Sequence, residues 1–233
     1  MKRLVYIFTI CFLALTGCAT KGSRIAELCD KYDKFVALTF DDGPSTLTPR
    51  VLDILEQYDA TATFFVIGSQ IDTTTEPTIR RAVVLGCEIG SHSFTHPYMT
   101  KLSKEAQLKQ SEQTIAAIEK YAPAPKYFRP PYMDADEVTH GVVPQIFIGG
   151  YCPSDWDANV SVEERIKGLL ENVEDGLIFI LHDFKDNNGT VEALEMVIPE
   201  LQKQGYGLVS VGELFAIKGV KAKRGVIYDK VVR

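Results

Sequence analysis

The chain has 233 residues, of which 45% are hydrophobic and 24% are charged, and its formal net charge is −6. The apolar fraction excludes a disordered chain, and the length suffices for one large domain with its own core. A mean hydropathy of −0.01 excludes a protein that crosses a membrane many times, and the acidic balance gives no basic face for nucleic acid. We therefore expect no nucleic-acid partner, and the sequence gives no sign of an obligate protein partner.

The first residues have the pattern of an export signal. Lys2 and Arg3 precede an apolar run over 4–16, which is too short to span a bilayer but suits a signal peptide. Leu15-Thr16-Gly17-Cys18 resembles the lipobox of bacterial lipoproteins, so we predict a signal peptide over 1–17 and a lipid on Cys18 that anchors the protein to a bacterial membrane. The alternative is a plain secretory signal with an incidental cysteine. Both predict a protein that works outside the cytoplasm.

The rest of the chain divides into a tether and N-terminal segment over 18–33, one large domain over 34–217 and a basic tail over 218–233. Within the domain, short apolar runs alternate with amphipathic stretches; an Asp-Asp-Gly-Pro turn closes the first run, and Pro49 starts the helix that follows. We predict strands over 35–40, 61–67, 87–89, 127–128, 145–151, 177–181 and 207–211, and helices over 48–58, 79–85, 103–121, 162–173, 190–204 and 211–217. Strands buried on both faces and alternating with helices favour a parallel α/β sheet, either open or closed into a barrel.

Some residues receive an ordinary structural interpretation. Three cysteines follow the export segment, and their odd number and spacing favour small buried side chains over a disulfide or metal motif, although one bridge and a free thiol remain an alternative: Cys29, Cys87 and Cys152. His140 fits no motif and is predicted at the surface. The basic tail is predicted to be solvated, with contact to an anionic surface as the alternative. Asp183, Asp186, Asn187 and Asn188 are interpreted as loop and turn residues, with contact to a ligand at the neighbouring His182 as the alternative.

Polar residues gather where the predicted strands end. Asp41-Asp42 follows the first strand, and His92 and His96 follow the third. Arg129-Pro130-Pro131-Tyr132, Asp155-Trp156 and His182-Asp183 follow later strands. Each segment alone has an ordinary explanation as a turn, corner or cap. Because parallel α/β folds collect functional groups at the carboxyl ends of their strands, all five together predict a site.

These residue types suit metal-assisted hydrolysis of an acyl group. Two histidines and one carboxylate are the three protein ligands of a catalytic zinc, which acidifies a water in its fourth position. One of the paired aspartates would ligate and the other would act as base, its ionised form favoured by the charge of Arg129. His182 would protonate the leaving group with Asp155 orienting its ring, and the Tyr132 N–H would contact an oxyanion.

The motifs resemble the five ordered motifs of the polysaccharide deacetylases, carbohydrate esterase family 4, from about residue 34 to residue 217. They are Thr39-Phe40-Asp41-Asp42-Gly43, His92-Ser93-x-x-His96-Pro97, Arg129-x-Pro131-Tyr132, Asp155-Trp156 and Ile180-Leu181-His182. The resemblance implies a distorted, incomplete (β/α) barrel that binds one divalent metal and removes acetyl groups from carbohydrate. Zinc is the expected ion, with Co²⁺, Mn²⁺ or Ni²⁺ as alternatives.

Carried over by position, the resemblance assigns a role to each motif residue. Asp41 is the base, Arg129 tethers it, His182 is the acid and Asp155 orients that acid. The Tyr132 N–H stabilises the oxyanion. The implied metal ligands are Asp42, His92 and His96, and the implied substrate-binding residues are Pro131, Tyr132 and Trp156.

Two departures from the family pattern concern the substrate groove. Cys152 stands where the fourth motif often has an earlier aspartate, and Met133 stands where a glycine often follows the tyrosine. The expected substrate is an acetylated polysaccharide or oligosaccharide, namely an N-acetylglucosamine polymer such as peptidoglycan or chitooligosaccharide, or O-acetyl xylan. The alternatives are a hydrolase of a small non-carbohydrate amide and a catalytically silent carbohydrate-binding lipoprotein.

Overall fold

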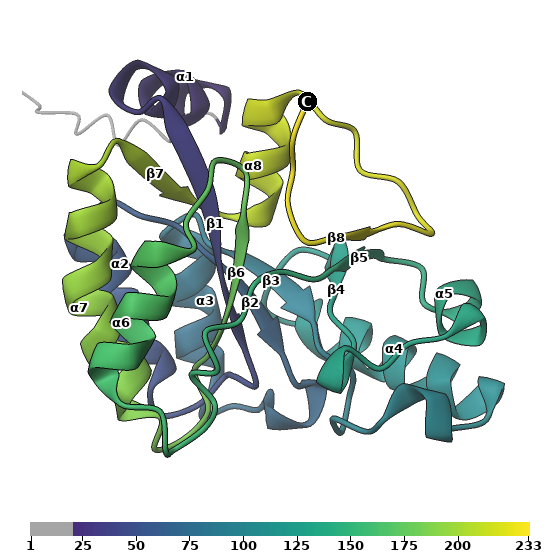
Figure 1. The fold of residues 1–233 in the computed structure, drawn as a ribbon. Helices are drawn as coiled ribbons and strands as arrows, with labels where there is room; N and C mark the ends of the chain where they lie inside the picture. The colour runs from purple at the N-terminus through teal and green to yellow at the C-terminus, as the bar shows by residue number, and fades with distance from the viewer. Residues whose placement is uncertain (1–20) are drawn as a thin grey trace, which may run out of the picture.

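The computed structural model describes residues 21–233, where eight strands form one sheet flanked by helices (Figure 1). The strands are β1 (Lys34–Asp41), β2 (Thr63–Val66), β3 (Glu88–Ser91), β4 (Tyr127–Phe128), β5 (Ile146–Ile148), β6 (Ile178–His182), β7 (Tyr206–Val209) and β8 (Ile227–Tyr228). The α-helices are α1 (Lys21–Lys31), α2 (Thr48–Gln57), α3 (Glu76–Val84), α4 (Lys104–Ile118), α5 (Glu137–Val142), α6 (Val162–Glu171), α7 (Asn188–Lys203) and α8 (Val211–Lys218). Three short 3₁₀ helices are η1 (Gly68–Gln70), η2 (Met99–Lys101) and η3 (Pro131–Met133).

The sheet is parallel and curls into an incomplete barrel. Its strand order is β6-β1-β2-β3-β4-β5-β8, with β7 beside the first half of β1. Tyr151, three residues after β5, pairs with Phe179 of β6, so the chain beyond β5 returns to the other edge of the sheet. The distorted, incomplete (β/α) barrel expected from the sequence is therefore confirmed.

Alternation along β1 separates the core from the site. Val36, Leu38 and Phe40 belong to the largest core cluster, which also contains the buried faces of α2 and α7. Figure 1 shows both helices on one side of the sheet. Because successive side chains of a strand point to opposite faces, Thr39 and Asp41 point into the curled sheet. A mostly hydrophobic strand therefore packs one face against the core and holds the buried carboxylate of Asp41 on the other.

The N-terminal segment is more ordered than a tether. Residues 21–31 form α1, whereas the sequence indicated a polar stretch up to residue 24. Leu28 is buried in the second core cluster, and Arg24 pairs with Asp59 and with the buried Glu213 of α8. Because the segment is polar in composition, the sequence did not predict this helix, whose apolar face packs against α8. The predicted signal peptide and Cys18 lie outside the described residues.

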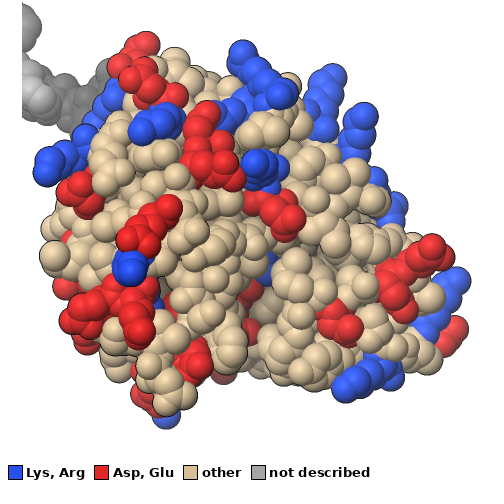
Figure 2. Space-filling model, in the orientation of Figure 1, with Lys and Arg blue, Asp and Glu red and all other residues tan. Residues whose placement is uncertain are grey.

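The C-terminal tail is not a free solvated segment, so that prediction is corrected. β8 adds a parallel strand to β5, and Val231 is buried. Lys and Arg side chains project from the upper right of Figure 2, where Figure 1 places this segment, and Lys221, Lys223 and Arg224 are exposed. The backbone joins the fold because an open strand edge is available, while the charged side chains remain in water.

Two minor predictions also change. His140 lies in α5, a helix that the sequence did not predict, and its ring packs 4.0 Å from that of Phe147, so it is partly buried and not a surface residue. All three cysteines of the described chain are free, but Cys87 alone is buried, whereas Cys29 is exposed and Cys152 is partly exposed. Within residues 21–233, none of the helices has the length and apolar character that a membrane crossing needs.

Candidate active site

Strand register brings the predicted site residues together at the carboxyl ends of the strands. Asp41 at the end of β1 pairs with His182 at the end of β6. Ser91, which precedes His92, pairs with Phe128, which precedes Arg129. Residues separated by as many as 141 positions (182 − 41) thus meet because parallel strands end at the same edge.

A cavity of about 460 Å³ opens at this edge. Its lining includes almost every predicted site residue: Asp41, Asp42, His92, His96, Arg129, Pro130, Tyr132, Met133, Cys152, Trp156, Ile180 and His182. Trp156 and Tyr132 have 57% and 56% of their surface exposed, so both offer flat aromatic faces to a ligand. Pro131 and Asp155 are the exceptions, because both are buried; Pro130 lines the cavity in place of Pro131, and Asp155 lies behind His182. The chain turns sharply in η3, where Tyr132 has φ of 58°, and consecutive residues there face different sides.

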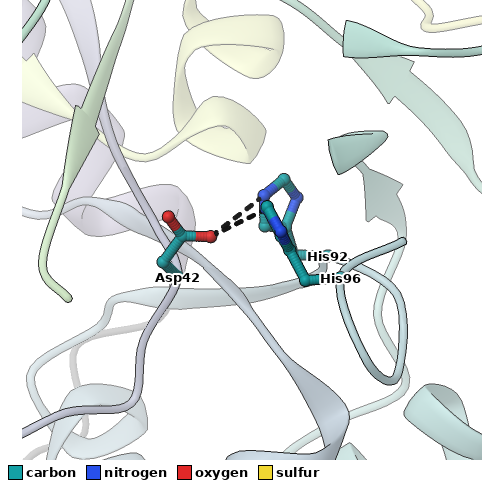
Figure 3. Close-up of side chains that lie close together, drawn as sticks. All are labelled: Asp42, His92 and His96. Atoms are coloured by element: carbon teal, nitrogen blue, oxygen red, sulfur yellow. Dashed lines mark ion pairs between the residues drawn. The ribbon is translucent and has the colours of Figure 1, made fainter. Parts of the chain in front are cut away.

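The predicted metal ligands form one cluster. Oδ1 of Asp42 lies 3.5 Å from Nε2 of His92 and 3.1 Å from Nε2 of His96. Figure 3 shows the carboxylate facing both rings, which come from the loop after β3. Nδ1 of His92 lies 2.6 Å from the carbonyl oxygen of Arg129. Because that contact occupies Nδ1 with a proton, Nε2 keeps its lone pair toward Asp42.

This cluster fits a divalent cation. Oδ1 of Asp42 is buried, and within residues 21–233 it finds no hydrogen-bond partner. Such an atom is costly unless a positive charge faces it. Burial by itself would raise the pKa of the Asp42 carboxyl, but positive charge at the two histidine rings outweighs burial and holds the pKa well below its ordinary value, as a cation between the rings would. Two imidazoles and one carboxylate are also the donor set of many catalytic zinc sites.

The backbone around the cluster is held in unusual conformations. Asp42 has φ of 72° and His96 has φ of 59°, both in the left-handed region. A Cβ on Gly43 would lie 2.7 Å from the carboxylate of Asp183, so only glycine fits beside that group. Non-glycine residues rarely adopt the left-handed conformation of Asp42 and His96, and they do so mainly at functional sites where the surrounding structure imposes it.

Asp41 is held by Arg129 inside the curled sheet. Nη1 of Arg129 donates to Oδ1 of Asp41 at 2.7 Å and to Oγ1 of Thr39 at 2.6 Å. The other guanidinium nitrogens donate to the carbonyl oxygens of Ile148 and Gly149. This places every guanidinium nitrogen in a hydrogen bond, so Arg129 is a rigid support for the carboxylate. Oδ2 of Asp41 remains 3.9 Å from Nε2 of His92, beside the metal cluster.

His182 is paired with a fully buried carboxylate. Nδ1 of His182 lies 2.8 Å from Oδ1 of Asp155, and the His182 backbone N–H donates to Oδ2 at 2.8 Å. Thr190 also donates to Oδ2. Burial lowers the pKa of His182, but Asp155, together with the charges of Asp41 and Asp42, raises it more, and the result is a pKa of about 9. The ring is therefore protonated at neutral pH, as a general acid must be.

Sequence reasoning missed several supporting residues. Asp183, interpreted as a loop residue, is fully buried, and its Oδ2 accepts from Thr48 at 2.5 Å. Asn187 donates to the carbonyl oxygen of His182 and is itself held by Arg165. Tyr98 stacks on Tyr132 with ring centroids 4.0 Å apart and extends the aromatic surface at the cavity. The position of Asp183 beside His182 was the only sequence signal for any of them.

The comparisons with known proteins agree with this geometry. The family model for polysaccharide deacetylase matches residues 30–146. A bifunctional xylanase/deacetylase of Pseudobutyrivibrio xylanivorans is 43% identical over 188 residues, which cover 80% of this chain but 31% of that protein. A peptidoglycan-N-acetylglucosamine deacetylase of Bacillus cereus is 37% identical over 196 residues, covering 80% of this chain and 90% of that protein.

A solved structure shares the fold. It is a family 4 acetyl xylan esterase from Clostridium thermocellum in complex with a cobalt ion, with 41% sequence identity and a TM-score of 0.82. The match covers 85% of this chain and 99% of that one. The metal-binding character of that relative accords with the Asp42, His92 and His96 cluster described above.

Proposed function

Because the chain belongs to the polysaccharide deacetylase family, we propose that it is a metal-dependent hydrolase that removes acetyl groups from carbohydrate. The observation that carries this proposal is one cavity containing a metal-type cluster, an arginine-held carboxylate and a protonated histidine. A binding protein needs neither a base nor an acid in its site. A small-amide hydrolase would share this chemistry, but the exposed faces of Trp156 and Tyr132 suit the larger surface of a sugar.

We propose zinc as the bound metal, with Asp42, His92 and His96 as its ligands. A divalent cation there would polarise an acetyl carbonyl and lower the pKa of a water to about 7. The wholly nitrogen and oxygen donor set also accepts Co²⁺, Mn²⁺ or Ni²⁺.

The roles of the other residues follow from their contacts. Asp41 is within reach of the metal cluster and takes the proton of the attacking water, while Arg129 holds its carboxylate in place. His182 delivers a proton to the departing sugar oxygen or nitrogen, and Asp155 keeps that proton on the outer nitrogen of the ring. Tyr132, in the strained turn of η3, is the proposed backbone donor to the oxyanion.

We also propose that the substrate is a polymer. The relatives are named for xylan and peptidoglycan, and this chain has a second cavity of about 420 Å³ that shares Trp156 with the first. A chain of sugars would extend past Trp156 into that second cavity. A small amide would leave it empty.

The test is acetate release by the purified chain from acetyl xylan, peptidoglycan and chitooligosaccharide in parallel, each with zinc and after chelation. We expect chelator-sensitive release from at least one polymer. The purified His182→Ala variant is the control for contaminating esterases. Release that survives chelation or the His182→Ala change, or no release from any of the three polymers with zinc bound, would overturn the proposal.

We propose that Cys18 carries a lipid and holds the enzyme at the outer side of a bacterial membrane. The support is the sequence over 4–18 described above. Cells fed an alkyne-labelled fatty acid should label the wild-type chain and the Cys29→Ser control, but not the Cys18→Ser variant. Equal labelling of the Cys18→Ser variant would contradict the proposal.

A further inference from the structure

A second cluster of metal-binding groups lies in the same cavity. Cys152, Asp155 and His182 offer one sulfur, one carboxylate oxygen and one ring nitrogen, all within 4.8 Å of one another. Cys152 and His182 line the cavity, so the cluster opens to solvent, whereas Asp155 is fully buried behind them. None of these atoms belongs to the cluster of Asp42, His92 and His96.

The two oxygens of Asp155 have different surroundings. Oδ2 is occupied by the His182 backbone N–H and by Thr190, at 2.8 Å and 2.7 Å. Oδ1 faces two donors that can lose their protons, the Sγ of Cys152 at 3.8 Å and Nδ1 of His182 at 2.8 Å. Oδ2 thus anchors the carboxylate, while Oδ1 points at two potential metal ligands.

These separations are close to those that zinc requires. With bonds of about 2.0 Å to nitrogen and oxygen and 2.3 Å to sulfur, ligand atoms of a tetrahedral site lie roughly 3.3 to 3.6 Å apart. The contact from sulfur to Oδ1 is slightly longer than this range, and the contact from Nδ1 to Oδ1 is shorter because it is a hydrogen bond. The sulfur and the ring nitrogen lie within 4.8 Å of each other, so formation of the site requires both side chains to adjust around Oδ1.

We propose that Cys152, Asp155 and His182 bind a second zinc ion, and that this ion inhibits the enzyme by removing its general acid. Zinc accepts mixed sulfur, nitrogen and oxygen ligands, and a solvent molecule would complete the tetrahedron from the cavity. The inhibition rests on the proposed function, whereas the binding of zinc does not.

The proton balance gives the site a pH dependence. Zinc binding displaces one proton from the Cys152 thiol and one from Nδ1 of His182, and the ring keeps its proton on Nε2 as a neutral imidazole. The groups facing the cluster are Asp41, which is paired with Arg129, and Asp42, whose charge is balanced by the first ion when that ion is bound. Burial and Asp155 raise the pKa of the Cys152 thiol to about 11. Because both protons must leave, zinc should bind this site more weakly at low pH and more tightly as pH rises.

Spectroscopy separates this site from the first. The purified full chain, loaded with one equivalent of zinc, is titrated with Co²⁺ and monitored for a sulfur-to-cobalt charge-transfer band in the near ultraviolet. The first cluster contains no sulfur and cannot produce that band. We expect the band in the wild type and in Cys29→Ser, which removes the cysteine that is exposed among the described residues, but not in Cys152→Ser. Absence of the band in the wild type, its persistence in Cys152→Ser or its loss in Cys29→Ser would overturn the proposal.

A measurement on the unaltered chain avoids dependence on how Cys152→Ser folds. A second equivalent of zinc should protect Cys152, but not Cys29, from alkylation by iodoacetamide, as read by mass spectrometry of the peptides. Unchanged labelling of Cys152 would contradict the zinc site whether or not the enzyme is a deacetylase.

Activity measures the inhibition itself. Excess zinc should inhibit acetate release by the wild type, more strongly at pH 8 than at about pH 6. Because even outer partners of a metal site are worth about 10- to 100-fold in affinity, Cys152→Ser should need at least about tenfold more zinc for half-inhibition. Equal sensitivity of both chains, with a cobalt–sulfur band present in the wild type, would refute the inhibition alone.

Discussion

Two clusters of similar composition line one cavity but have opposite hydrogen bonding. In the first, Oδ1 of Asp42 faces two ring nitrogens, and within the described chain no hydrogen bond reaches it. In the second, both oxygens of Asp155 accept hydrogen bonds, from the backbone, the ring of His182, Thr190 and Cys152. Among the described residues, Oδ1 of the Asp42 carboxylate is thus free of hydrogen-bond donors, whereas both oxygens of the Asp155 carboxylate are occupied by them.

This difference separates metal chemistry from proton chemistry. A buried carboxylate oxygen without hydrogen-bond donors, beside two imidazoles, is the environment that a divalent cation would stabilise. A carboxylate saturated by donors stabilises an imidazolium and keeps its proton available. The second cluster takes a metal only when two of those protons leave, which is why we expect its zinc to bind more weakly.

The largest expected effect comes from His92→Ala, which removes one nitrogen from the first cluster. The bound metal contributes several kcal/mol to the transition state, so kcat/KM should fall about 10³-fold or more together with metal content. Elemental analysis and acetate release check both. His140→Ala is the matched control, because His140 lies outside the cavity, and it should keep metal and activity. Full metal occupancy in His92→Ala would mean that the first cluster is not the metal site.

Asp41→Asn tests whether the arginine-held carboxylate acts on protons and not on the metal. The variant should keep its metal, since Asp41 is not part of the first cluster, while kcat falls about 10²- to 10⁴-fold. Loss of the metal along with activity would move Asp41 from base to ligand.

Asp155→Asn should change the pH dependence more than the metal content. His182 has its pKa raised to about 9, so the acid is present at neutral pH and is lost as pH rises through about 9. Without the charge of Asp155, the alkaline decline of kcat should move toward pH 6.5, and kcat at neutral pH should fall about 10²-fold. A pH–rate profile measures the shift. An unchanged alkaline limb would show that His182 is not the acid.

Asp183 is a third buried carboxylate, to be compared with Asp42 and Asp155. Its substitution should have the smallest effect on activity of those proposed. Its Oδ1 lacks a hydrogen-bond partner among the described residues, and no cation pairs with it, so burial raises the pKa of its carboxyl to about 7. The folded protein therefore keeps a proton there that the unfolded chain, with a pKa near 3.8, releases. This term makes stability fall as pH rises from about 4 to 7, by at most about 4 kcal/mol.

Asp183→Asn should remove that pH dependence. Thermal unfolding at pH 5 and pH 8 should show a larger loss of Tm for the wild type than for the variant, while activity changes little. A wild-type Tm that falls no more than that of the variant would show that Asp183 is ionised in the folded protein.

The fold and the main site residues were largely predictable because they depend on local patterns. The apolar run over 35–40 and the Pro49 helix start predicted β1 and α2 to within one residue at each end. The strand-end positions of Asp41, His92, Arg129 and His182 predicted a common site, since parallel strands share a carboxyl edge. Short motifs were therefore sufficient to predict which residues form the candidate site.

Other features depended on contacts that the sequence does not encode locally. Residues 21–31 have too polar a composition to predict a buried face, and only the presence of α8 turns them into a packed helix. The tail joins the sheet because β5 offers it an edge. In the cavity, tertiary structure alone decided that Pro130 and not Pro131 lines the wall, and that Cys152 lies within reach of Asp155 and His182.

The sequence by itself determined which groups were available: two histidines and paired aspartates for a metal and a base, and a histidine with an aspartate for an acid. Tertiary structure decided which oxygen of each carboxylate was satisfied by hydrogen bonds and which was left for a cation. The physical reason is that this distinction depends on burial and on donors distant in sequence, such as Thr190 beside Asp155, and neither is a property of a short motif.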